Sequence, residues 1–378
     1  MASRRRTPSL SSRTRLVLWT RGAGRCYICN KALLGDLLTG AEDRNFGFVA
    51  HIVAEAPGGP RGDPVRSSLL ADDASNLLLL CHVHHKLIDV DAVAAYPESR
   101  LLEIKRDHEN RIEIVVDVAP DRSSHVLRYA ANIGGHQSPV AYAEIAAAML
   151  PERYPADGRH TLDIELRGSA FQDREEDFWS IEQENLRRQF RSKLGGLLER
   201  RDIRHLSVFA LAPQPLLIEL GRLLGDIVPA SVHQKHREPV GWRWAEDEGP
   251  IQLEIDAPSK PGDEVALILA MSATLDPERV RRVLGPETAV WAVRASEPHN
   301  DILRRAEDLQ RFRRTMRRVY DRIKSDHPAA RQIHVFPAVP VAAAVEVGRT
   351  WMPKADLPLE IYDENRAVGG FARALRIE

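Results

Sequence analysis

The segment LLLLCHVHHKLID, residues 77–89, contains one cysteine and three histidines within five positions, namely Cys81, His82, His84 and His85. Thiolate and imidazole groups are metal ligands, so this composition predicts metal binding, with chance clustering as the alternative. If a helix begins near Cys81, His84 lies on the same face, whereas His85 points about 100° further round. Adjacent helical residues rarely bind one ion together. The pattern therefore indicates two ions, one bound by Cys81 and His84 and another bound by His85.

A CxxC pair upstream completes the first of these sites. The chain has three cysteines, and the two outside the segment are Cys26 and Cys29. Together with Cys81 and His84 they supply three thiolates and one imidazole, a donor set suited to a closed, tetrahedral structural zinc site. The alternative is three buried thiols that behave as small hydrophobic residues. An odd cysteine count with a CxxC pair also favours a reducing cytoplasm over a disulfide framework.

The segments RCYIC, AHIVA and NLLLLCHVHHKLID resemble the HNH nuclease family, which has a ββα-metal fold with a zinc knuckle. The resemblance implies that His51 is the general base, that Asn76 holds His51 and the hairpin loop in place, and that His85 binds a catalytic divalent ion such as Mg²⁺. The chemistry suits these residue types, because an imidazole with a pKa of about 6.5 can deprotonate water near neutral pH. A bound divalent ion neutralises charge on the phosphate.

One position departs from the family pattern. Many HNH enzymes place a metal-binding aspartate directly before the base, and here that position is Ala50. A second protein ligand for the catalytic ion must therefore come from elsewhere. Asp63, in the GPRGD loop, is the first candidate. Asp89, one helical turn after His85, is the second, and it would either bind the ion or orient His85.

Alternation and β-branched residues predict the elements that position these groups. We expect strands at 45–54 and 76–81, and helices at 13–22, 82–93 and 99–113. We place an HNH domain at residues 1–120, followed by a connector at 121–160. Its N-terminal arm, residues 1–31, carries eight Lys or Arg and no acidic residue, although the net charge of the whole chain is −1. Such an arm is typical of a solubilising tail or, beside a nucleic-acid site, of a DNA contact.

Residues 161–378 are predicted to form an α/β domain in which strands alternate with helices. The expected strands are short apolar segments at 161–166, 206–211, 251–256, 264–273, 289–293 and 332–338. The longest helix is expected at 301–326, with one apolar stripe and eight arginines mainly on other faces.

One unit of this domain is repeated. LSVFALAPQPLLIELGRLL (206–224) aligns without gaps on IHVFPAVPVAAAVEVGRTW (333–351) at an offset of 127. Six positions are identical, among them Gly221/Gly348 and Glu219/Glu346. Both copies predict a strand, a proline-marked turn and a helix, the unit from which doubly wound α/β domains are built. We interpret the pair as a duplicated Rossmann-like half, with chance similarity as the alternative.

The segments HVFPAVPVAAAVEVGRTWMP, LPLEIYD and LILAMSATLDPERV resemble the SAVED domain, a sensor made of two fused CARF-like halves. HNH followed by SAVED resembles the DNA-degrading effectors of CBASS anti-phage systems. The resemblance implies that a cyclic di- or trinucleotide, made by a partner nucleotidyltransferase, binds the SAVED domain. It also implies that the ligand drives dimers into tetramers, which then cleave double-stranded DNA and arrest or kill the infected cell.

The residues that hold such a ligand should supply cations or helix N-termini for phosphates and planar groups for bases. Candidates of these types are Lys235, Trp242, Trp244, His299 and Asn300. The turns at 212–215 and 338–341 should present helix N-termini. Burial in the core is the alternative for at least one of the tryptophans.

Two other functions fit the same residues. A restriction-type HNH nuclease, whose second half reads modified DNA, would cleave without a nucleotide ligand. A catalytically inactive HNH module would bind DNA in response to a nucleotide, and Ala50 favours this alternative. The longest apolar run, VALILAM at 265–271, is too short to span a bilayer, and no apolar stretch follows the first arginines. We therefore expect a cytoplasmic protein without a membrane partner.

Overall fold

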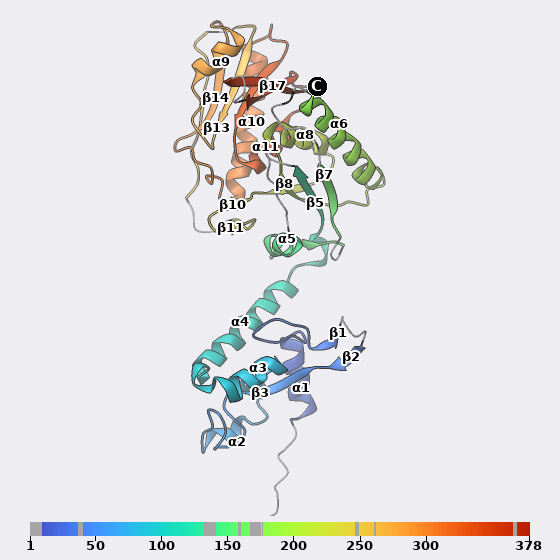
Figure 1. Ribbon diagram of the computed structural model, residues 1–378, viewed down its shortest axis with the longest axis vertical. Coiled ribbons are helices and arrows are strands. Elements are labelled where there is room, and N and C mark those ends of the chain that lie inside the picture. The colour runs from blue at the N-terminus through green and yellow to red at the C-terminus, as the bar shows by residue number, and fades with distance from the viewer. Residues whose placement is uncertain are drawn as a thin grey trace, which may run out of the picture. The chain divides into compact units, whose positions relative to one another are not determined.

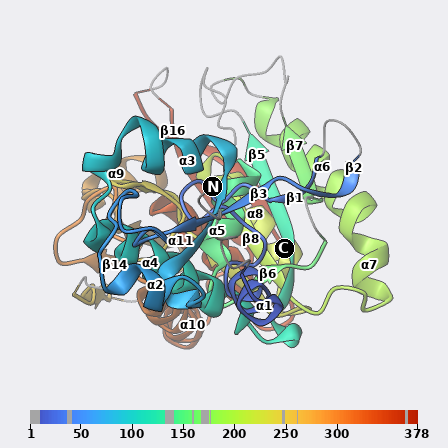
Figure 2. The same ribbon diagram turned by 90° about the horizontal axis from the view of Figure 1, so that it is seen from below.

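The computed structural model describes residues 10–36, 41–131, 141–157, 160–166, 175, 177–245, 249–260, 262–365 and 369–378. The chain divides into two compact units, Met1–Ala119 and Pro120–Glu378, which run from blue to cyan and from teal to red in Figure 1 and Figure 2. The first nine residues of the basic arm lie outside the described residues. Among the described helices, none has the length and apolar character needed to cross a bilayer.

Two antiparallel strands and a helix form the centre of the first unit. β3 (Gly47–His51) pairs with β4 (Leu77–Cys81), so that Gly47 lies opposite Cys81 and His51 opposite Leu77. β4 leads directly into α3 (His82–Lys86) and the π-helical turn η2 (Leu87–Asp91). The two expected strands and the expected helix after Cys81 are therefore present, although each strand is shorter than its predicted range.

The four leucines of β4 are fully buried, because the strand is covered on both faces. Leu18 of α1 (Ser12–Arg21) and Leu101 of α4 (Glu98–Val116) belong to the same buried cluster. The remaining elements of this unit are β1 (Leu34–Asp36), β2 (Ala41–Asn45), α2 (Arg66–Leu70), η1 (Ala74–Asn76) and η3 (Val93–Ala95).

The second unit contains two sheets, and its mixed α/β fold confirms the predicted class. In the first sheet β5 (Ser123–Ala131) is parallel to β8 (Leu206–Leu211) on one edge. On its other edge it pairs with β6 (Tyr154–Pro155) and then β7 (Leu162–Leu166), while β9 (Ala230–His233) continues the sheet beyond β8.

The position of β5 corrects the predicted connector at 121–160. Residues 123–131 of this segment form a central strand of the first sheet, with neighbours on both edges. Both of its faces are largely covered, so its apolar residues do not alternate with polar ones along the whole strand. The segment HVLRYAA therefore lacks the alternating pattern by which a half-exposed strand is recognised.

The second sheet has six strands in the order β12–β14–β13–β15–β16–β17. The four inner strands are parallel, and the two edge strands are antiparallel to their neighbours. The bounds are β12 (Leu253–Asp256), β13 (Val265–Ala270), β14 (Ala289–Ala295), β15 (Ile333–Ala338), β16 (Leu359–Asn365) and β17 (Gly370–Ile377). A short hairpin, β10 (His236–Arg237) and β11 (Val240–Gly241), lies outside both sheets.

Helices complete both halves of the second unit. They are η4 (Pro120–Arg122), α5 (Tyr142–Met149), α6 (Phe178–Phe190), η5 (Arg191–Gly195), α7 (Gly196–Glu199), α8 (Gln214–Leu224), α9 (Pro277–Leu284), α10 (Ala306–Asp326) and α11 (Val341–Thr350). The helix expected from residue 301 begins at Ala306. Asp301 lies in the turn before this helix and accepts hydrogen bonds from the backbone N–H groups of Arg237 and Glu238. These bonds hold the turn against β10.

The two copies of the repeat form corresponding elements, β8–α8 and β15–α11, and their helices cross at the two identical glycines. A Cβ atom at Gly348 would overlap the carbonyl oxygen of Ile218 and lie 2.7 Å from the amide nitrogen of Arg222. The contact is reciprocal, because a Cβ at Gly221 would overlap the carbonyl of Val345 and lie 2.9 Å from the nitrogen of Arg349. Each helix also contacts strands of the opposite half.

A buried ion pair accompanies each glycine. The Glu219 carboxylate accepts hydrogen bonds from Arg222 at 2.6 and 2.9 Å and from Arg187 at 2.7 Å. In the second copy Glu346 accepts a bond from Arg349 at 2.6 Å. Both carboxylates are almost fully buried. Their charge is compensated by an arginine three residues later in the same helix, which is what a buried carboxylate requires.

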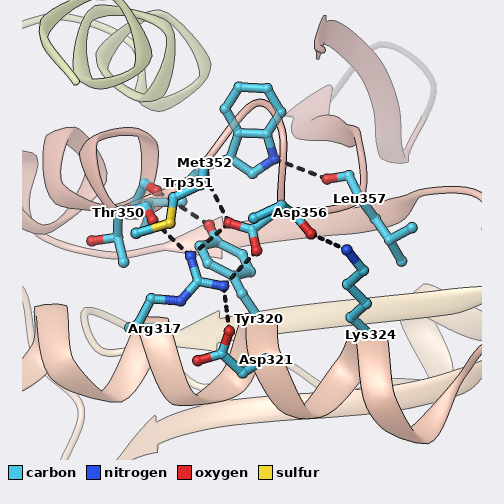
Figure 3. A network of polar contacts seen from close by, with 11 residues as sticks. Arg317, Tyr320, Asp321, Lys324, Thr350, Trp351, Met352, Asp356 and Leu357 are labelled. Atoms are coloured by element: carbon cyan, nitrogen blue, oxygen red, sulfur yellow. Dashed lines mark hydrogen bonds and ion pairs between the residues drawn. The ribbon is translucent and has the colours of Figure 1, made fainter. Parts of the chain in front are cut away.

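The turn between α11 and β16 is fastened to α10, as Figure 3 shows. Arg317 donates to both oxygens of Asp356, and also to Asp321 at 2.7 Å and to the carbonyl of Thr350 at 3.2 Å. Asp356 in turn accepts the Met352 N–H at 2.8 Å. The hydrogen bond to Asp356 is the main cause that raises the pKa of Arg317. The side chain of Asp356 is 2% exposed, so this pair fixes the turn.

We expect Gly348→Ala to destabilise the second unit, because the added methyl group has no space between α8 and α11. Overpacking typically costs about 1–3 kcal/mol, and each kcal/mol lowers the melting temperature of a unit of this size by about 2–4 °C. The control is Gly195→Ala, another helical glycine, where the nearest side-chain atom is Arg191 Cγ at 3.6 Å. Calorimetry of the full chain should separate the variants, and equal melting would contradict the role assigned to the crossing.

Candidate functional site

Potential metal-binding side chains at the junction of β4 and α3 point in two directions. Cys81 ends the strand and precedes the helix, and His84 and His85 lie within its five residues. The CxxC turn follows α1 and is joined to β4 by a hydrogen bond from the Tyr27 N–H to the carbonyl of Leu79 at 2.9 Å. Within the turn, Asn30 adopts the left-handed conformation with φ 60°.

The four residues predicted to bind one ion are brought together. The side-chain donor atoms of Cys26, Cys29, Cys81 and His84, which we call the cysteine–histidine cluster, all lie within 4.8 Å of one another. His84 Nδ1 is 3.2 Å from Cys81 Sγ and 3.6 Å from Cys26 Sγ, and the sulfurs of Cys29 and Cys81 are 4.0 Å apart. Three thiolates and an imidazole at these separations could hold one tetrahedral ion.

The thiols of the cluster are unequal. Burial raises the pKa of Cys26, but the backbone N–H groups of Cys29, Cys81 and Ile28 outweigh burial, so the net shift is downward. Burial raises the pKa of Cys29 to about 11; the Lys31 N–H opposes this, and the neighbouring Cys26 adds to it. A thiolate at Cys26 therefore disfavours the formation of a second thiolate at Cys29. A cation among the sulfurs would remove that repulsion and release protons as it binds.

A separate cavity of about 250 Å³ contains His51 and His85, two of the residues predicted to do chemistry. We call it the His51–His85 cavity, and it is lined by Val49, Ala50, His51, Ala54, Glu55, Pro60, His85 and Asp89. His51 comes from the end of β3, whereas His85 and Asp89 come from α3 and η2. The structure therefore places the two histidines in one cavity, apart from the ligand set of the cluster.

One ring nitrogen of His51 is held by the backbone. Its Nε2 lies 3.0 Å from the carbonyl oxygen of Ala71. A carbonyl oxygen can only accept, so Nε2 carries the proton and donates it. In the neutral ring Nδ1 is then unprotonated, which is the form required of a base.

Asn76 is 4% exposed and joins the two ends of the loop between the strands. Its amide nitrogen donates to the carbonyls of Val53 at 2.9 Å and Leu70 at 3.2 Å, and its Oδ1 accepts the Val53 N–H at 2.8 Å. These bonds hold residue 53, which lies two positions after His51. They also hold residue 70, which precedes Ala71, whose carbonyl binds the His51 ring. Asn76 therefore acts on His51 through the backbone rather than by direct contact.

The two aspartate candidates differ in position. Asp63 Oδ1 accepts the N–H groups of Val65 at 2.8 Å and Arg66 at 2.7 Å, so it caps the start of α2. These backbone bonds lower its pKa, and it does not line the His51–His85 cavity. Asp89 does line it, with Oδ2 3.6 Å from His85 Nε2. Of the two candidates, Asp89 therefore shares the cavity with His85, whereas the predicted Asp63 does not.

Sequence reasoning missed three residues around this cavity. Glu55 adds a second carboxylate to its lining. Phe48 stacks on the His85 ring, with centroids 5.2 Å apart. Arg61 donates to Asp89 Oδ1 at 2.6 Å. Glu55 and Arg61 belong to the loop EAPGGPRGDP, whose glycine and proline content indicated only that it was a loop. Among the described residues, the cysteine–histidine cluster is the one group of three or more potential metal ligands that the structure gathers.

The five predicted nucleotide-binding residues have mixed surroundings. Trp242 is buried and packs edge-on against Phe209, so it is a core residue and not a surface on which a base could stack, which corrects that prediction. Lys235 lies over the Trp242 ring and pairs with Glu144 at 3.0 Å. Trp244 is half-buried, whereas His299 and Asn300 are exposed just before Asp301.

The turn at 338–341 also differs from expectation. The backbone N–H of Val339 donates to Gln214 Oε1 and that of Ala342 donates to Gln234 Oε1, both at 3.1 Å. Both glutamines belong to the first half of the unit. Two of the amide groups at this helix start are therefore bound to side chains, and these bonds join the two halves.

The family described as "SMODS-associated and fused to various effectors sensor domain" (SAVED) matches residues 186–377. The chain is similar to a Cap4 SAVED/CARF-domain containing receptor from Acinetobacter baumannii, whose structure was solved with the cyclic trinucleotide 2'3'3'-cAAA. The two share 10% sequence identity with a TM-score of 0.44, and the match covers 82% of this chain and 59% of the receptor. A Cap4 receptor from Moraxella osloensis matches at 11% identity and a TM-score of 0.43, covering 82% and 58%. The chain thus spans less than two thirds of these receptors' length. No curated protein matches it.

We predict that purified full-length protein contains about one zinc ion per chain, held by the cysteine–histidine cluster. His84→Ala and Cys26→Ser should each lower the zinc content strongly and expose residues up to 119 to proteolysis, since the ion would staple a unit with a small core. His82→Ala is the control, because His82 is exposed and outside the cluster. Elemental analysis measures the outcome. Unchanged zinc in the His84 and Cys26 variants would contradict the four-ligand site.

Proposed function

Because the chain belongs to the SAVED family of sensor domains fused to various effectors, we propose that it is a cyclic-oligonucleotide-activated HNH endonuclease. In this proposal the second unit is the sensor, and the first unit is the effector that hydrolyses phosphodiester bonds of double-stranded DNA. The setting we propose is anti-phage defence of the CBASS type. The observation that carries the nuclease assignment is the shared cavity of His51 and His85, which is distinct from the cysteine–histidine cluster.

His51 is proposed to be the general base. Its Nδ1 takes a proton from a water molecule in the cavity, and the water oxygen attacks the phosphorus of the DNA backbone. The bond from phosphorus to one sugar oxygen breaks as the new bond forms, and the departing oxygen takes a proton from solvent water. The ring then becomes an imidazolium whose Nε2–H still donates to the carbonyl of Ala71. That carbonyl keeps the ring in one orientation and favours the positive charge. Asn76 supports the step by holding the backbone on both sides of this contact.

His85 and Asp89 are proposed to bind the catalytic divalent ion. Their facing atoms, Nε2 and Oδ2, are 3.6 Å apart, a separation that one ion could bridge. Two protein donors leave further positions for water and substrate oxygens, as is usual for Mg²⁺. When bound, the ion would neutralise charge on the phosphate and the leaving oxygen. Phe48 fixes the His85 ring by stacking on it.

The sensor is proposed to control the effector through assembly. A ligand shifts such an equilibrium only if it binds the assembled state more tightly than the idle one. We propose that a cyclic di- or trinucleotide binds at the second unit and drives dimers into tetramers in which the first unit cleaves DNA.

The first test incubates the full-length protein with plasmid, Mg²⁺ and a panel of cyclic di- and trinucleotides. We expect cleavage with one nucleotide and none without, together with an increase in mass by analytical ultracentrifugation. Cleavage without any nucleotide would instead favour a modification-dependent restriction enzyme. Nucleotide-dependent DNA binding without cleavage would favour an inactive DNA-binding module.

The second test is His51→Ala. Loss of a general base typically lowers a rate by about 10²–10⁴-fold, so we expect cleavage to fall by this factor while ligand-driven assembly is unchanged. The control is His160→Ala, a largely exposed histidine of the second unit. If His51→Ala also abolished assembly, His51 would be structural and the assignment of the base would be wrong.

A further inference from the structure

Arg61 makes contacts that no other arginine of the first unit matches among the described residues. Its Nε donates to the carbonyl of Ile52 at 2.8 Å and its Nη1 to the carbonyl of Ile88 at 2.8 Å. Its Nη2 donates to Asp89 Oδ1 at 2.6 Å and lies 3.4 Å from the carbonyl of His51. The side chain is 8% exposed, although it comes from a surface loop.

These contacts join the two walls of the His51–His85 cavity. The carbonyls of residues 51 and 52 lie at and just after the end of β3, which carries the proposed base. Ile88 and Asp89 belong to η2, which follows the proposed metal ligand His85. A guanidinium is planar and has five donors in a fixed fork, so one Arg61 side chain sets the separation of both walls.

The loop that carries Arg61 has little freedom to adopt another shape. Arg61 has a φ of 58°, a conformation that is unfavourable for a residue other than glycine. A Cβ at the following residue, Gly62, would lie 2.6 Å from the carbonyl oxygen of Ala56. Such strain persists only where surrounding contacts compensate it, and the bonds of the Arg61 side chain do so.

We propose that Arg61 is the positioning residue that presents Asp89 to the catalytic ion. The two oxygens of Asp89 then have separate roles. Oδ1 is held by Arg61 at 2.6 Å, and this leaves Oδ2 directed toward His85 Nε2 at 3.6 Å. With one oxygen fixed, the carboxylate cannot rotate away from the ion. This inference rests on the proposed nuclease function. The role assigned to Arg61 requires the planar guanidinium and not only its positive charge.

The experiment measures Mn²⁺ binding to the zinc-loaded full-length protein by calorimetry, with Arg61→Lys as the variant. Lysine keeps the charge but has no planar fork, so it cannot hold Asp89 and three carbonyls together. Loss of a group that orients a metal ligand typically weakens metal binding about 10–100-fold, and we expect a loss of this size. The matched control is Arg66→Lys, whose arginine is an exposed partner of Glu98. It should bind Mn²⁺ as the wild type does.

A double variant shows whether Arg61 acts through Asp89. In the Asp89→Asn background, Arg61→Lys should cause little further loss of Mn²⁺ affinity, because the group it positions has already changed. Equal affinity of the Arg61 and Arg66 variants, or an equal loss with and without Asp89, would overturn the inference. So would a wild-type protein that binds no Mn²⁺.

If Arg61→Lys also loses its zinc, the wild-type protein provides the test. A crystal soaked in Mn²⁺ should show the ion bound to Asp89 Oδ2 and His85, with Oδ1 still on Arg61. An ion elsewhere in the cavity would overturn the inference. The plasmid assay separates this result from the proposed function, because a chain that binds Mn²⁺ through Asp89 but cleaves no DNA with any nucleotide would disprove only the nuclease assignment.

Discussion

The start of α3 is the constraint on which the first unit depends. The side chains of Cys81 and His84 lie against those of the CxxC turn, and His85 follows His84 by one position. The helix geometry then forces the next imidazole away from the cluster and toward the His51–His85 cavity. An ion in the cluster would therefore stabilise the fold. It would also orient His85, the proposed catalytic ligand, because His85 directly follows His84.

The cavity also depends on backbone carbonyls from both of its walls. Ala71 binds the His51 ring, Val53 and Leu70 bind Asn76, and Ile52 and Ile88 bind Arg61. Polar side chains thus connect the long loop after β3 to the elements on both sides of it. A loop held in this way can keep the proposed base and the proposed metal ligands at a fixed separation, which the proposed hydrolysis would require.

In the second unit the corresponding constraint is the crossing of α8 and α11 at Gly221 and Gly348. Each helix has its own strand in one half and contacts strands of the other half. The halves are further joined by Gln214 and Gln234, which bind backbone N–H groups at the start of α11. A ligand at this end of the sheets would have to fit or displace these bonds. The fold therefore offers a route by which binding could change how the halves pack.

The amino-acid sequence by itself determined the features that depend on local spacing. These are the four residues of the cysteine–histidine cluster, the strand–helix order around Cys81, the duplicated βα unit and the alternating α/β pattern of the second half. It did not reveal β5, where Arg128 interrupts the continuous apolar run by which the buried strand β4 was recognised. Nor did it reveal β9, β16 and β17. The sequence also did not show which of Asp63 and Asp89 lines the cavity. It did not show that Trp242 is buried or that Arg61 reaches across the cavity. Those outcomes depend on contacts between residues far apart in the chain, and only the tertiary structure decides which loop side chain meets which strand end.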